Sequence, residues 1–212
     1  MSLIHERIKD YFPTVLITLL SIVQALALEL LWGHIDESEY LFVWGWPAVV
    51  YWIQVLSTLI GIVLIWLIYA MNAMRFRWLP SIMDSIFPFI VGIIQFILVA
   101  DLGPDGEGAW LFLMGVVFIL MTWSAQETMR RARLDPENAE FFENLKPATL
   151  RDFAPQIVFS SLMAALGIYV AFGSADGVVS TIGILLTFAV VVWQFVNMCR
   201  FWMDTIEPES TQ

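Results

Sequence analysis

Six long stretches of apolar residues, separated by short polar connections, dominate the hydrophobic pattern of the chain. They cover residues 13–32, 46–74, 81–102, 109–126, 155–172 and 178–198. Each run is close to or above the roughly 20 residues that cross the hydrocarbon core of a bilayer, and charged residues are rare inside them. The pattern predicts an all-α, polytopic membrane protein in which residues 1–212 form a single integral membrane domain with six transmembrane helices.

Composition supports the lipid environment and removes several classes of site. Hydrophobic residues make up 59% of the chain and charged residues 14%, with a mean hydropathy of +0.78, which lies outside the range of soluble globular domains. The single cysteine, Cys199, excludes an internal disulfide. The two histidines, His5 and His34, lie outside the apolar runs. We therefore expect no metal and no cofactor.

The connections between the runs alternate in charge. If the amino terminus is inside, the inner segments hold all ten basic residues, namely Arg7, Lys9, Arg75, Arg77, Arg130, Arg131, Arg133, Lys146, Arg151 and Arg200. The outer connections then hold only acidic charges, namely Asp36, Glu37, Glu39, Asp101, Asp105, Glu107 and Asp176. Because basic residues favour the cytoplasmic side, we predict a multi-pass protein of the inner (plasma) membrane with both termini cytoplasmic.

Two polar segments on the inner side have amphipathic character. Residues 1–12 alternate apolar and charged positions, which predicts a lead that lies along the membrane surface. In the connection after residue 134, Asp135 suits an N-cap and Pro136 a first helical position, so we expect a short surface helix at about residues 136–145. Its apolar side would consist of Phe141, Phe142 and Leu145. These side chains are the candidate contact for a membrane-protein partner; the alternative is that they pack on the membrane surface.

The helix starts and exits suggest a threefold repeat. Runs one, three and five each begin with an aspartate followed by a proline three or four residues later, and runs two, four and six each exit with an amide before an arginine. We interpret the chain as three antiparallel helical hairpins, residues 1–78, 79–134 and 147–203. Ordinary helix-start chemistry and the preference of arginine and tryptophan for headgroups explain part of the same pattern.

Polar residues inside the apolar runs are the candidates for function, because polar groups are costly in a bilayer. The strongest set forms a candidate polar seam of Ser21, Gln24, Glu29, Gln54 and Gln95. One interpretation is a hydrophilic path or ion site, fed by the acidic outer connections. The other is that small and amide residues hold helices together while the carboxylate of Glu29 reaches the headgroups.

Chemical motifs add little beyond this. The sequence contains no nucleophile and base pair, no phosphate-binding glycine loop and no paired metal-binding carboxylates, so we expect no enzyme, and nothing indicates nucleic-acid binding. The six-helix layout is similar to that of small bacterial potassium channels related to the lysosomal one. The arginine-phenylalanine-serine-aspartate signature of that family is absent from residues 13–32, so the resemblance assigns no residue a role.

The sequence therefore favours a small channel-like or transporter-like protein that acts on ions or small solutes. The alternative is a non-catalytic subunit or scaffold of a larger membrane complex. In both cases the lipid bilayer is the immediate partner, and the many tryptophan and phenylalanine side chains favour a homo-oligomer.

Overall fold

The computed structural model describes residues 3–143, 149–173 and 177–206. Its elements are α1 (Leu3–Glu37), η1 (Glu39–Leu41), α2 (Trp46–Arg75), α3 (Ile82–Ala100), α4 (Glu107–Leu134), η2 (Pro136–Asn138), α5 (Ala139–Phe142), α6 (Leu150–Phe172) and α7 (Gly177–Ile206). Every α-helix except the short α5 is long and apolar enough to cross a membrane. The predicted all-helical protein with six membrane-capable helices is confirmed.

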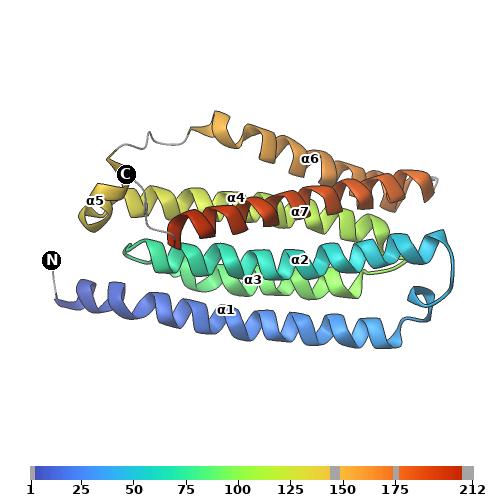
Figure 1. Cartoon of the computed structure of the whole chain (residues 1–212), viewed down its shortest axis with the longest axis horizontal. Helices are drawn as coiled ribbons and strands as arrows, with labels where there is room; N and C mark the ends of the chain where they lie inside the picture. Colours follow the sequence, from blue (N-terminus) through green and yellow to red (C-terminus); the bar gives the residue numbers. More distant parts are fainter. Residues whose placement is uncertain (1–2, 144–148, 174–176, 207–212) are drawn as a thin grey trace.

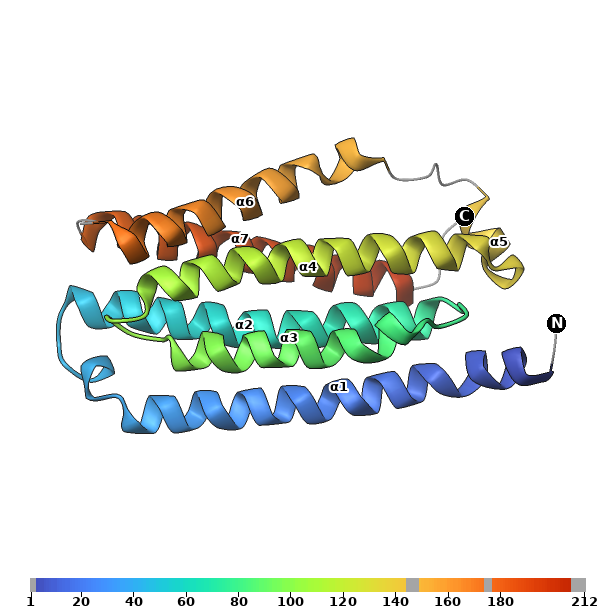
Figure 2. The same cartoon turned by 180° about the vertical axis from the view of Figure 1, so that it is seen from behind.

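The long helices run side by side, with α1 at one edge of the bundle and α6 at the opposite edge (Figures 1 and 2). The most extensive contacts join α4 to α6 and α2 to α7, whereas α6 and α7, which are adjacent in sequence, share a much smaller contact. α1 begins and α7 ends at the same end of the bundle (Figure 1). The common origin of three hairpins stays a prediction.

The centre of the bundle is a contact between α2 and α4. The indole of Trp110 is fully buried and donates a hydrogen bond from Nε1 to Oγ1 of Thr58 at 2.9 Å. Nearer the end of the bundle at which α1 begins, the hydroxyl groups of Tyr69 and Ser124 lie 3.1 Å apart and bridge the same two helices. Since an unpaired polar group is expensive in an apolar surrounding, these hydrogen bonds fix how α2 and α4 face each other.

α4 and α6 approach each other backbone to backbone through glycines. A methyl group added at Gly167 would lie 2.3 Å from the backbone nitrogen of Phe112, and one added at Gly115 would lie 2.6 Å from the backbone oxygen of Ser160. Small residues permit such close approach between membrane helices, where packing has to replace the hydrophobic effect as the driving force. The contact covers the second half of α6, from about Ser160 onward.

Capping boxes start two of the helices. Oδ2 of Asp84 accepts from the backbone nitrogen of Ser81 at 2.6 Å, and Oδ2 of Asp152 accepts from that of Thr149 at the same distance. These bonds satisfy free N–H groups in the first turn. The recurrent aspartate before a proline is therefore helix-start chemistry in α3 and α6. In α1, the helix begins at Leu3 and runs through Pro13, so the first residues are its opening turns rather than a separate surface lead.

The segment between α4 and α6 is shorter and less regular than the predicted surface helix. A 3₁₀ turn over Pro136–Asn138 leads into a single α-helical turn over Ala139–Phe142, and residues 144–148 lie outside the described part. The amide of Asn138 ties this segment to the bundle, because its Nδ2 donates to the backbone oxygens of Arg77 at 2.6 Å and Ala132 at 2.7 Å.

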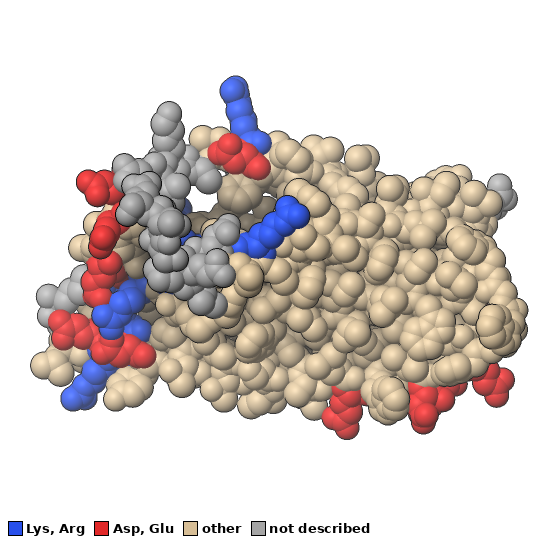
Figure 3. All heavy atoms as spheres, viewed as in Figure 1, with Lys and Arg blue, Asp and Glu red and all other residues tan. Residues whose placement is uncertain are grey.

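Charge divides the bundle into two ends. On the face shown in Figure 3, Lys and Arg lie toward one end, which we call the basic end, and only Asp and Glu lie at the opposite, acidic end. Within the described residues, the basic end contains the start of α1, the end of α2 and the end of α4. The separation is the one that the alternating connections predict, while the side of the membrane that each end faces stays a prediction.

Candidate functional site

Two residues of the predicted polar seam, Gln24 and Gln95, form an amide pair between α1 and α3. Nε2 of Gln24 donates to Oε1 of Gln95 at 3.1 Å, and Nε2 of Gln95 donates back to Oε1 of Gln24 at 3.0 Å. Both side chains are buried, with 5% and 2% of their surface exposed. Because each amide satisfies the other, the pair works as a bond between two helices.

The other members of the seam lie in different surroundings. Oε1 of the fully buried Gln54 accepts from the backbone nitrogen of Gly103 at 3.0 Å, which holds α2 to the connection after α3. Oγ of Ser21 accepts from Nε1 of Trp66 at 3.1 Å. Glu29 is exposed on the surface of α1. The structure thus brings Gln24 and Gln95 together and gives the remaining three residues separate roles.

The candidate partner contact packs against the protein itself. The rings of Phe141 and Phe142 lie 5.0 and 5.6 Å from the ring of Phe76 at the end of α2, and both side chains are half-buried. Leu145 lies outside the described residues. The two phenylalanines therefore already have an internal role, which is to cover the basic end of α2.

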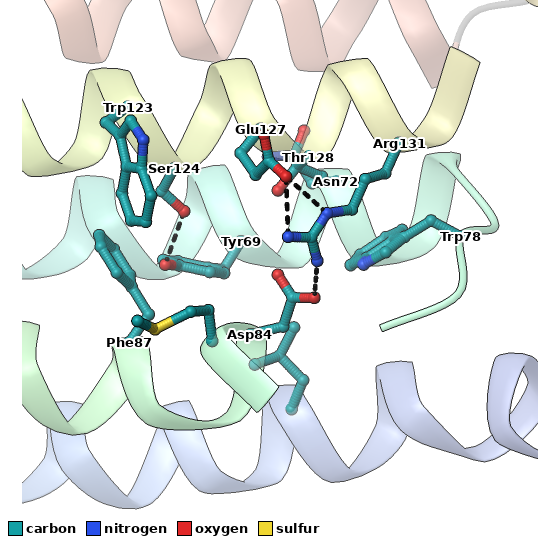
Figure 4. A pocket seen from close by; sticks show the side chains of 12 residues that line it. Tyr69, Asn72, Trp78, Asp84, Phe87, Trp123, Ser124, Glu127, Thr128 and Arg131 are labelled. Carbon is teal, nitrogen blue, oxygen red and sulfur yellow. Dashed lines mark hydrogen bonds and ion pairs between the residues drawn. The ribbon is translucent and has the colours of Figure 1, made fainter. Parts of the chain in front are cut away.

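A small polar pocket lies at the basic end between α1, α2, α3 and α4 (Figure 4). Arg131 occupies it, with Nη1 2.6 Å from Oδ2 of Asp84 and Nη2 2.8 Å from Oε1 of Glu127. The remaining cavity of about 20 Å³ has room for roughly one water molecule. Opposite charges fill this pocket, so it is an ion-pair cluster that joins α3 to α4 rather than a site with space for a solute.

A larger open cavity, a crevice of about 380 Å³, lies between α2, α4, α6 and α7. We call it the α6 crevice, and its walls include Leu64, Thr122, Phe153, Gln156, Gln194 and Asn197. It exists because the first half of α6 stands away from α4 and α7 at the basic end, as both cartoon views show (Figures 1 and 2). Its volume falls within the few hundred cubic ångströms typical of small-molecule sites.

The wall of the α6 crevice is apolar with a few polar groups. Nε2 of Gln194 on α7 donates to Oε1 of Gln156 on α6 at 3.0 Å, and both side chains are half-buried. Asn197 lies one helical turn farther along α7. An apolar cavity with a small number of fixed polar groups is the usual composition of a ligand site.

A smaller cavity lies next to the crevice in the interior of the bundle. It has about 40 Å³, lies between α2, α3, α4 and α7, and is lined by Thr58, Gln95 and Gln194. Gln194 and four apolar residues, Leu64, Ile68, Phe118 and Met121, line both spaces. These shared side chains separate the α6 crevice from the inner cavity, which reaches Gln95 of the buried amide pair.

Sequence reasoning singled out Gln95 but not Gln156. The reason is local: Gln156 follows Pro155 in the second turn of α6, where the helix-start pattern accounts for polar residues. The available signal was the presence of amides in both runs, Gln156 in run five and Gln194 and Asn197 in run six. Among the described residues, no group of three or more His, Cys, Asp or Glu side chains is placed to hold a metal.

Comparisons with protein-family models, with curated proteins and with solved structures found no match to this chain. The case for a function therefore rests on the α6 crevice and its surroundings.

Proposed function

We propose that the chain is a transporter-like membrane protein that takes a small amphiphilic molecule from the bilayer into the α6 crevice. One observation carries the proposal: α6 separates from α4 and α7 over its first half and leaves an apolar cavity of about 380 Å³ whose polar groups include Gln156, Gln194 and Asn197. An apolar chain would occupy the wall, and the amides would bind a polar group.

The same geometry favours an amphiphile over a free ion. Among the described residues, no carboxylate lines the crevice or the inner cavity, and the amides of Gln24 and Gln95 satisfy each other. Glu29, the residue expected in an ion path, is exposed on α1 at the opposite edge of the bundle from α6 (Figure 1). A cation would find no charged ligand in this cavity.

The test uses lysophosphatidylcholine that carries a photoactivatable diazirine on its acyl chain. The purified protein in nanodiscs is irradiated with this probe, and the labelled peptides are mapped by mass spectrometry. We expect labels on the crevice faces of α6 and α7, and a drop of about tenfold in Ala125→Trp, which fills the crevice. Ala154→Trp, an equal substitution on the exposed surface of α6, is the control. Uniform labelling of all lipid-facing helices would refute the proposal.

Movement of the amphiphile is a separate measurement. Proteoliposomes that contain a fluorescent lysophosphatidylcholine are treated with dithionite, which destroys only the label in the outer leaflet. A protein that moves the lipid between leaflets lets the signal fall below the half that empty liposomes retain. Labelling of the crevice without such movement would reduce the role to binding.

A second candidate function, a subunit of a larger complex, is favoured by the tip between η1 and α2. Phe42, Val43, Trp44 and Trp46 are all more than half exposed there, and Trp44 is completely exposed. Aromatic residues also anchor helices at headgroups, so a photoactivatable amino acid at position 44 in native membranes distinguishes the two. Crosslinks to one protein would favour the subunit role, whereas crosslinks to lipid alone would exclude this contact.

We also infer that the basic end faces the cytoplasm, because positive charge gathers there and is retained on that side. Cysteine introduced at Trp44 should react with a membrane-impermeant maleimide from outside, and cysteine introduced at Arg77 should react only after lysis. The reverse pattern would invert the topology.

A further inference from the structure

The guanidinium of Arg75 contacts two aromatic rings, one of which belongs to the wall of the α6 crevice. Its central carbon is 4.3 Å from the ring centroid of Phe141 on α5 and 4.4 Å from that of Phe201 on α7. Phe201 is also part of the crevice wall. The cation is therefore held at the boundary between the basic end of the bundle and the apolar cavity.

Arg75 differs from other basic residues of this end in what surrounds it. Lys9 forms an ion pair with Asp135, and Arg77 forms ion pairs with Asp10 and Glu137. Arg131 is likewise paired, as described above. Arg75 has no carboxylate partner among the described residues, and its Nη1 is buried without a hydrogen bond there. Two aromatic rings contact the cation, and its Nη1 has no acceptor among the described residues.

Such an environment is suited to a phosphate. A desolvated guanidinium without an acceptor is costly, and its planar fork of donors matches phosphate oxygens in a bidentate arrangement. The contacts with the two rings leave Nη1 as a donor that a ligand could satisfy. A phosphate that binds there enters at the mouth of the crevice, and whatever is attached to it continues along α7.

The spacing along α7 suits the rest of a lipid molecule. Asn197 precedes Phe201 by one turn, about 6 Å along the helix axis, so its amide lies where the glycerol region would follow the phosphate. Beyond it, the wall contains the amide pair of Gln156 and Gln194 and the apolar side chains of Phe118, Phe153 and Trp193. A cation, a short stretch of amides and apolar side chains thus correspond to a phospholipid's headgroup, ester region and acyl chain.

The net charge of the ligand follows from Arg75 itself. No ion pair joins this guanidinium to a carboxylate among the described residues. Its positive charge would repel the cation of a zwitterionic headgroup. A headgroup with a net negative charge avoids this repulsion.

We propose that the α6 crevice binds a glycerophospholipid with an anionic headgroup, whose phosphate is held by Arg75 between Phe141 and Phe201. The inference rests on the proposed function, since it names the class of amphiphile that enters the crevice. It assigns the charge preference to Arg75 and the length of the bound chain to the cavity between α6 and α7.

The experiment compares two photoactivatable lipids with the same diazirine acyl chain, phosphatidylglycerol and phosphatidylcholine, in nanodiscs of neutral lipid. We expect phosphatidylglycerol to label the crevice peptides of wild type about tenfold more strongly. Arg75→Gln should lower its labelling to the level of phosphatidylcholine, and Arg75→Lys, which keeps the charge but not the fork, should retain an intermediate preference. Arg77→Gln, two residues away and paired with carboxylates, is the matched control and should behave as wild type.

Each outcome decides a different statement. Equal labelling of the crevice by both lipids in wild type would overturn the anionic preference and leave the proposed amphiphile site intact. A preference that survives in Arg75→Gln would overturn the role of Arg75. No labelling of the crevice by either lipid would overturn the proposed function itself. If Arg75→Gln does not elute as a monodisperse protein, wild type and Arg75→Lys still decide. Equal labelling by the two lipids in wild type, or an undiminished preference in Arg75→Lys, would contradict the proposal.

Discussion

The two halves of α6 face the same bundle in opposite ways. In the second half, Gly167 and its neighbours lie against the backbone of α4 with no room for a methyl group. In the first half, Phe153 and Gln156 line an open crevice. One half of α6 is thus fixed by close packing on α4, whereas the other stands away from α4 and is joined to α7 by the hydrogen bond between Gln156 and Gln194. The position of α6 depends on the glycine contact rather than on the loops.

The largest effect is expected from a substitution that disturbs the tightly packed half of α6. Gly167→Ala places a methyl group 2.3 Å from the backbone of Phe112, so α6 has to move, and we expect a loss of about 2 kcal/mol in unfolding free energy. Unfolding by SDS in mixed micelles measures it. Gly61→Ala is the control, because a methyl group there would have nothing within 4 Å. Equal stability of the two variants would contradict the close contact.

A smaller loss of stability is expected when an amide pair is broken, and the loss should be greater in the closed interior than in the crevice wall. Gln24→Leu leaves Gln95 buried without its partner and should lower the unfolding free energy by about 1.5 kcal/mol. The analogous Gln156→Leu should cost only about 0.5 kcal/mol, because the half-buried Gln194 borders an open cavity. The same SDS titration compares them, with Gln24→Leu/Gln95→Leu expected to recover most of the loss. A larger effect for Gln156→Leu would reverse the assignment of open and closed regions.

Chemical accessibility compares the crevice with the buried core and does not depend on a measurement of stability. In a Cys199→Ser background, cysteine at Asn197 in the crevice should react with a small maleimide at least tenfold faster than cysteine at Thr187, which is fully buried. The rates are measured by mass shift over time in detergent. Similar rates at the two positions would mean that the crevice is closed in solution.

The smallest effect is expected at the opposite edge of the bundle. Glu29→Gln alters an exposed side chain on α1, so its unfolding free energy should stay within about 0.5 kcal/mol of wild type. Cation flux into liposomes should also be unchanged, because Glu29 lines neither the crevice nor the inner cavity. A fall in flux on this substitution would restore the ion path through α1.

The sequence predicts where the helices lie along the chain better than which helices pack against each other. Hydropathy identifies six membrane-capable helices because a bilayer requires about 20 apolar residues from each. It also identifies Gln24 and Gln95 as exceptional, since polar residues in such runs are rare. It does not show that these two meet, because hydropathy carries no information about which helix lies beside which. The contact of α4 with α6 is hidden for the same reason, although Gly115 and Gly167 are visible as small residues.

The α6 crevice was beyond sequence reasoning for a further physical reason. It is a space, and its size depends on the angle between α6 and its neighbours, which the contact near Gly167 sets from the far half of the helix. The lack of a carboxylate partner for Arg75 among the described residues is hidden too. In the sequence it is one of many basic residues near a helix end, and only the fold shows that Phe141 and Phe201 surround it.

The amide of Asn138 gives the chain an order of assembly. Its hydrogen bonds to the backbone at Arg77 and Ala132 fasten the segment after α4 to the end of α2 using residues that precede α6. Because chains fold from the amino terminus as they are synthesised, we expect α1 to α4 to be latched together before α6 is inserted. Nascent chains arrested after residue 160 should then already resist protease across these helices. The last two helices, α6 and α7, would then be added to a four-helix unit that has already formed. The α6 crevice, which we propose receives the ligand, lies between these two helices and that unit.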